Sequence, residues 1–149
     1  MGELSMESLQ EGLLRETRPP RRMDLVESLV QGIGELPGDF VESLLVRVLR
    51  DDENCIVRHE AAFVLGRLFG RGEIRGNLAW DALSKSALSD PSVVVRHEAA
   101  ESLGWFPEKR TIEFLEQLIS DRNPEVADTA KLGLMRMFDE LKGSQRGPE

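Results

Sequence analysis

The sequence lacks several features that would indicate particular classes of protein. It contains one cysteine, Cys55, no tyrosine and few aromatic residues. A single cysteine excludes a disulfide within the chain, so a reducing, cytoplasmic location is expected. No segment approaches the roughly 18 consecutive apolar residues of a membrane span, and the acidic, polar segment 1–10 lacks the regions of a signal peptide. The net charge of −8 argues against nucleic acid as a partner, because that binding neutralises phosphates with cations.

Strand-forming residues are also scarce, since tyrosine is absent and alanine, leucine, glutamate and arginine dominate. Apolar residues recur at spacings of three and four, as at Phe40, Leu44, Leu45 and Val48, which is the period of an amphipathic helix. Prolines and glycines divide the chain into short lengths. The sequence therefore predicts an all-α fold, with helices near residues 5–16, 22–34, 40–50, 53–69, 77–89, 91–106, 108–120 and 124–141.

The most distinctive feature is a hexapeptide, Val-Arg-His-Glu-Ala-Ala, which occurs at Val57–Ala62 and again at Val95–Ala100. The two histidines of the chain, His59 and His97, occupy the same place in the two copies, 38 residues apart. A weaker third unit follows 31 residues later, with Asp128 at the histidine position. Repeats of this length, built from two helices each, are typical of α-solenoids, in which neighbouring pairs stack to form one continuous core.

The sequence thus predicts a short α-solenoid of about four stacked helix pairs. It is expected to form one domain over residues 1–141, followed by a flexible polar C-terminal tail over residues 142–149. The pattern of Asp, four residues, then Val-Arg resembles the HEAT repeat over about residues 40–141. In that family the Asp and Arg side chains usually form a ladder between successive turns, which implies that Arg58 and Arg96 pair with Asp52 and Asp90.

The repeats are also similar to the HEAT-like repeats of the phycobilisome-lyase type. The equivalent helices of those proteins read Val-Arg-x-x-Ala-Ala, usually without a His-Glu pair. This resemblance implies a non-catalytic scaffold for protein–protein interaction, whose concave face binds a protein or stabilises a chromophore-bearing subunit.

The histidines and glutamates of the hexapeptide need another explanation than core packing. On a helical wheel His59 and His97 point nearly opposite to the buried valines and alanines. Adjacent solenoid helices lie roughly 8–10 Å apart, so both histidines are expected to reach one point, with Glu60 or Glu98 close by. Two imidazoles and a carboxylate hold iron in non-haem oxygenases and zinc in some hydrolases, so both metals stay open. Recent duplication of one repeat is the alternative explanation.

Arg-His-Glu-Ala-Ala within such repeats resembles deoxyhypusine hydroxylase, a di-iron HEAT enzyme with two His-Glu dyads in each half of its chain. The matching residues here are His59-Glu60 and His97-Glu98. The resemblance implies that these four residues are metal ligands in a non-haem iron monooxygenase or hydroxylase that acts on a basic protein side chain. One chain with two dyads would hold one ion, whereas a face-to-face homodimer would restore a di-iron centre.

Overall fold

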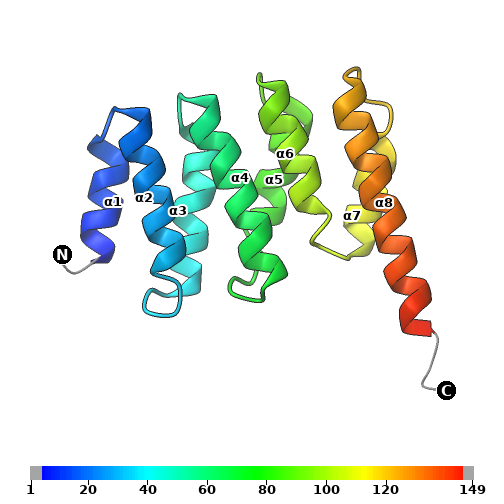
Figure 1. The fold of residues 1–149 in the computed structure, drawn as a ribbon, viewed down its shortest axis with the longest axis horizontal. Helices are drawn as coiled ribbons and strands as arrows, with labels where there is room; N and C mark the ends of the chain where they lie inside the picture. The colour runs from blue at the N-terminus through cyan, green and yellow to red at the C-terminus, as the bar shows by residue number, and fades with distance from the viewer. Residues whose placement is uncertain (1–4, 146–149) are drawn as a thin grey trace.

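The computed structural model describes residues 5–145, which form eight α-helices and no strand (Figure 1). The helices are α1 (Met6–Arg15), α2 (Pro19–Gln31), α3 (Gly38–Asp51), α4 (Cys55–Gly70), α5 (Ala79–Ser89), α6 (Val93–Leu103), α7 (Lys109–Leu118) and α8 (Pro124–Gln145). The predicted all-α class is therefore confirmed. None of the helices in the described range is long and apolar enough to cross a membrane.

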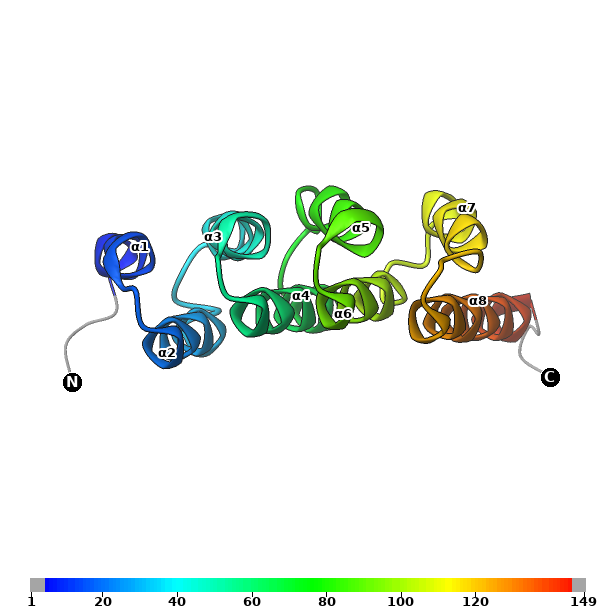
Figure 2. The same cartoon turned by 90° about the horizontal axis from the view of Figure 1, so that it is seen from above.

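The helices form two layers that run along the long axis of the molecule (Figure 2). The odd-numbered helices α1, α3, α5 and α7 make one layer, and the even-numbered helices α2, α4, α6 and α8 make the other. Within the second layer α4 packs on α6, and α6 packs on α8. Helices α1 and α8 lie at opposite ends (Figure 1). This arrangement confirms the predicted α-solenoid of stacked helix pairs.

The valine and the first alanine of each hexapeptide are core residues, as the helical wheel predicts. Val57, Ala61, Val95 and Ala99 have no solvent-exposed surface. They belong to one hydrophobic core that is continuous through all four helix pairs. Stacking therefore buries what no single pair of helices could bury alone.

Helix α2 begins earlier than the sequence pattern predicts. Its first residue is Pro19, three residues before the expected start at Arg22. Pro19 and Pro20 occupy the first turn, where a backbone N–H has no partner within the helix, so proline is tolerated there. Two prolines that resemble a helix breaker therefore begin a helix.

Helix α8 continues four residues past its predicted end, to Gln145. Lys142 lies in its last turn, where a cation interacts favourably with the unpaired carbonyl groups of the helix end. The first half of the tail predicted over residues 142–149 is therefore helical. The remaining residues, 146–149, lie outside the described part of the chain.

A ladder of Arg–Asp ion pairs connects successive repeats. Arg58 donates hydrogen bonds to both carboxylate oxygens of Asp90, at 2.9 and 3.0 Å, and these bonds raise the pKa of its guanidinium. The preceding rung joins Arg22 to the Asp52 carboxylate, with Nε and Oδ2 2.5 Å apart. Within its own repeat, Arg58 donates only to the backbone carbonyls of Asp52 and Glu53, at 2.8 and 3.2 Å, and Arg96 donates to that of Asp90, at 3.2 Å. The ladder expected between successive turns is therefore present, with Asp90 paired to Arg58 and Asp52 paired to Arg22.

A buried carboxylate from α3 begins helix α5. Glu42 is 2% exposed, and its two oxygens accept hydrogen bonds from the backbone N–H groups of Gly76, Leu78 and Ala79, at 2.9, 2.7 and 2.9 Å. Leu78 occupies the N-cap position of α5 and has no side-chain acceptor of its own. Glu42 therefore satisfies N–H groups that a helix start leaves unpaired, and its charge complements the helix dipole.

Replacing Glu42 with glutamine should lower the free energy of unfolding by about 1–3 kcal/mol, the usual cost of leaving buried donors without an acceptor. In the variant the amide NH₂ group would face backbone N–H groups whose hydrogen bonds a carboxylate oxygen accepts in the wild type. The volume of the side chain would stay the same. Urea denaturation measures the change. Glu116→Gln, on the exposed side of α7, is the matched control and should leave the midpoint unchanged. An unchanged midpoint for Glu42→Gln would contradict this role.

Candidate metal centre

His59 and His97 lie on α4 and α6, two helices of the second layer that pack directly on each other. The close approach of the two helices depends on Gly66, because a Cβ at that position would lie 2.7 Å from the Cβ of Ser102. The Ser102 hydroxyl donates a hydrogen bond to the carbonyl of Ala62, at 2.8 Å. These contacts hold α6 against α4 and bring the polar side chains of the preceding turns together.

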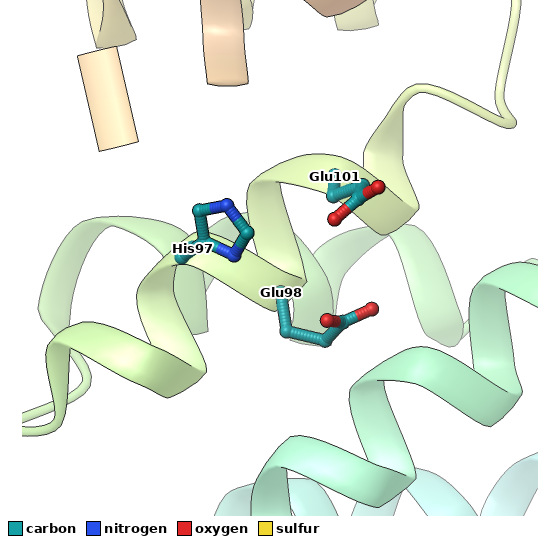
Figure 3. Close-up of side chains that lie close together, drawn as sticks. All are labelled: His97, Glu98 and Glu101. Atoms are coloured by element: carbon teal, nitrogen blue, oxygen red, sulfur yellow. The ribbon is translucent and has the colours of Figure 1, made fainter. Parts of the chain in front are cut away.

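Glu98 is the centre of the resulting cluster. Its side chain is 11% exposed, and its Oε2 lies 3.1 Å from Nε2 of His59 across the helix interface. On α6 itself, ligand atoms of His97, Glu98 and Glu101 all lie within 4.8 Å of one another (Figure 3). Glu98 therefore joins the histidines of two successive repeats.

The environment of Glu98 raises the pKa of its carboxyl group. Burial is the largest cause, because it removes water from the charged form, and the neighbouring Glu101 carboxylate raises the pKa further. The imidazoles of His59 and His97 act in the opposite direction. The cluster thus combines partly dehydrated negative charge with nitrogen donors, which is an arrangement that a divalent cation would neutralise.

Two of the four ligands expected from the sequence, His97 and Glu98, lie in one cluster with Glu101. A third, His59, contacts Glu98 across the helix interface and lies outside that cluster. Among the described residues Glu60 belongs to no such cluster. Neighbouring residues on a helix point about 100° apart, so His59 faces the following helix while Glu98 faces the preceding one. The role of Glu60 as a ligand stays a prediction.

Glu101 is the member of the cluster that sequence reasoning missed. It lies one turn after His97, at the i+4 position, on the same face of α6. Its counterpart in the first copy is Phe63, so the comparison of the two hexapeptides did not draw attention to it. Its spacing of four residues from His97 is the signal in the sequence that could have identified it.

Comparison with known proteins agrees with this architecture. Residues 42–135, more than half of the chain, match a family model described as HEAT repeats. The chain belongs to the HEAT-repeat family. The expected resemblance is thus confirmed, although comparison of this HEAT-repeat protein with curated proteins finds no match.

A solved structure extends the likeness to the whole fold of the HEAT-repeat protein. Human deoxyhypusine hydroxylase, in complex with glycerol, is similar with a TM-score of 0.74 and 24% sequence identity. The match covers 97% of this chain and 46% of that chain, so this HEAT-repeat protein spans less than half of the enzyme's length. At this identity the likeness shows a shared fold.

Glu98→Gln is expected to remove a penalty for burying a charge in the metal-free protein. Because the folded-state pKa of Glu98 is raised, the wild type loses stability as the pH rises from the ordinary glutamate pKa through the raised value. The free energy of unfolding of the variant, relative to wild type, should therefore increase over that interval and then level off. Urea denaturation between about pH 4 and 8 measures this difference. A difference that stays constant with pH would contradict the prediction, and Glu116→Gln is the control.

Proposed function

We propose that this HEAT-repeat protein binds a divalent transition metal ion, iron in the first place, between α4 and α6. His59 and His97 would supply imidazole nitrogens, Glu98 a carboxylate, and Glu101 a further carboxylate. The donor set suits Fe(II), and zinc is the alternative ion. The observation that carries the proposal is the position of Glu98, a buried carboxylate between histidines from two repeats.

The chemistry of the cluster fits such an ion better than it fits ordinary solenoid packing. The third unit of the same array stacks with Asp128 and Thr129 in the places of the dyad. A partly buried carboxylate without a cation is a cost in a purely structural protein. A bound ion would offset that cost, and its bond to His59 would replace the contact that now joins His59 to Glu98.

The finer proposal is oxidative chemistry on a basic protein side chain. Its support is the shared fold with a protein named deoxyhypusine hydroxylase, together with the residues around the cluster. Bound iron would supply reactivity toward O₂. The exposed carboxylate of Glu101 and the net charge of −8 would attract a cationic side chain. Phe63 and Val94 are 41 and 48% exposed, and each lies one turn from a histidine. They would contact the aliphatic part of the cationic substrate side chain.

Residues 5–145 offer one such set of ligands, so a di-iron centre would need a second copy whose cluster faces the first. The second candidate function is non-catalytic binding of a protein on the same surface. The observation that favours it is the exposure of Phe63, Val94 and Ile56, each within one helical turn of a histidine, of which Ile56 is 53% exposed. Exposed apolar residues gathered in one place mark interaction surfaces. Metal content distinguishes the two functions.

Anaerobic titration of Fe(II), and separately of Zn(II), into protein without a histidine tag should reach one ion per chain. His59→Ala, His97→Ala and Glu98→Ala should each weaken binding by more than about tenfold, because each removes a ligand. Glu60→Ala and Glu101→Ala, compared under the same conditions, identify which second carboxylate binds. Glu116→Ala should bind as the wild type does. A wild type that takes up neither ion stoichiometrically would overturn the metal centre and favour the scaffold.

Oxidative chemistry is tested with the iron-loaded protein, O₂, an electron donor and a peptide that carries an aminobutyl-lysine side chain. Mass spectrometry should detect the gain of one oxygen atom on the peptide, and Glu98→Ala should abolish it. Stoichiometric iron binding with an unmodified peptide would contradict this substrate class while leaving the metal centre in place.

A further inference from the structure

The last helix of the solenoid carries an exposed apolar stripe. Leu132, Met135 and Phe138 are 59, 62 and 46% exposed and follow one another at intervals of three residues along α8. Helix α8 is the longest helix, with 22 residues, and its C-terminal part extends beyond the other helices (Figure 1). We name Leu132, Met135 and Phe138 the α8 stripe.

The repeat register shows that the α8 stripe lies where a further repeat would pack. Gly66 of α4 lies against Ser102 of α6, and Gly104, at the end of α6, lies against Arg136 of α8. Met135 takes the equivalent position on α8, because it follows Gly104 by the repeat offset of 31 residues. Inside the array this contact position is glycine, whereas at the end it is a large apolar side chain. Exposed apolar residues gathered in one place mark interaction surfaces, and within the described residues no helix covers the α8 stripe.

We propose that the α8 stripe packs against the α8 stripe of a second copy of this chain, as an antiparallel pair of helices centred on Met135. Two-fold dimers bury the same patch of both subunits, which must therefore be complementary to itself. In an antiparallel pair, residues equidistant from the centre lie at the same level. Leu132 then lies level with the partner's Phe138, and Met135 lies at the two-fold axis beside the partner's Met135.

The charged residues on the same face as the stripe have the matching symmetry. Lys131 lies level with the partner's Asp139, and Asp128 lies level with the partner's Lys142, so opposite charges face each other at both levels. All four side chains are exposed and lie within about 40° of Met135 around the helix, at 100° per residue. In a parallel pair in register, each charged residue would lie level with the same residue of the partner, so like charges would meet. The charge pattern therefore selects the antiparallel pair of the same helix as the occupant.

The interactions that these charges make within one chain leave them available. Lys131 and Asp128 contact each other at 3.7 Å, with side chains 59 and 70% exposed, and an exposed pair of this kind contributes little. Pairing through α8 joins the two solenoids end to end and leaves the surface over α4 and α6 open. The two metal centres would stay separate, so this inference is independent of the proposed function.

Light scattering after size-exclusion chromatography tests the proposal on the full chain, whose mass is 16.7 kDa. The wild type should elute with twice that mass. Met135→Glu should raise the dissociation constant by more than about tenfold, because it places two like charges at the two-fold axis. Phe63→Glu, an exposed residue of α4, is the matched control and should stay dimeric. Unchanged helicity in circular dichroism shows that both variants fold, since both positions are exposed.

A wild type that remains monomeric up to on the order of 100 µM, a concentration well above the dissociation constants of stable dimers, would overturn the proposal. A dimer that Phe63→Glu separates and Met135→Glu does not would overturn it too, because the interface would then lie over the metal cluster. Met135→Glu should bind as much metal as the wild type, so the failure of this proposal and the failure of the metal centre are distinguishable.

Charge reversal tests the register of the pair. Lys131→Glu should weaken the dimer, because the introduced carboxylate would meet the partner's Asp139, and adding Asp139→Lys should restore the wild-type dissociation constant. A double variant that is as weak as the single variant would contradict the antiparallel register.

Discussion

The close approach of α4 and α6 at Gly66 is the constraint on which the rest of the structure depends. With a side chain at this position, α6 would have to move away, because a Cβ would overlap Ser102. The Arg58–Asp90 ion pair holds the same two repeats together at the other end of the interface. Between these two contacts the helices present His59 and Glu98 to each other at 3.1 Å. Packing of small residues therefore decides the geometry of the polar cluster.

The hexapeptide divides by role along the circumference of its helix. Valine and the first alanine of each copy are buried in the core, while the arginine of the first copy connects repeats through the ladder. Histidine and glutamate lie between these faces, where one side chain points to the following helix and the other to the preceding one. A dyad in each of two successive repeats thus produces one contact between them. Burial of Glu98, which raises its pKa, is the energetic cost of that contact in the absence of a cation.

The accuracy of the sequence-based predictions depended on the distance over which each interaction acts. Helices were predictable because the apolar period of three to four residues is a local signal. Helix boundaries were less predictable. Proline can either begin or end a helix, and here Pro19 and Pro20 begin α2. The ladder was predictable from the repeated Asp and Val-Arg pattern, but Arg22 as the partner of Asp52 was not, because that pair spans 30 residues and lies outside the pattern. Glu42 gave no signal at all, since its partners lie 34 to 37 residues later.

The sequence by itself determined the all-α class, the repeat, the buried face of each helix and the two histidines as candidates, because these depend on composition and on spacing within single helices. The tertiary structure decided which side chains meet. It placed Glu98 against His59 and grouped Glu98 and Glu101 with His97, because the direction of a side chain relative to a neighbouring helix depends on how the helices stack. It also showed that the α8 stripe lies at the end of the array, where no further repeat of the described chain covers it.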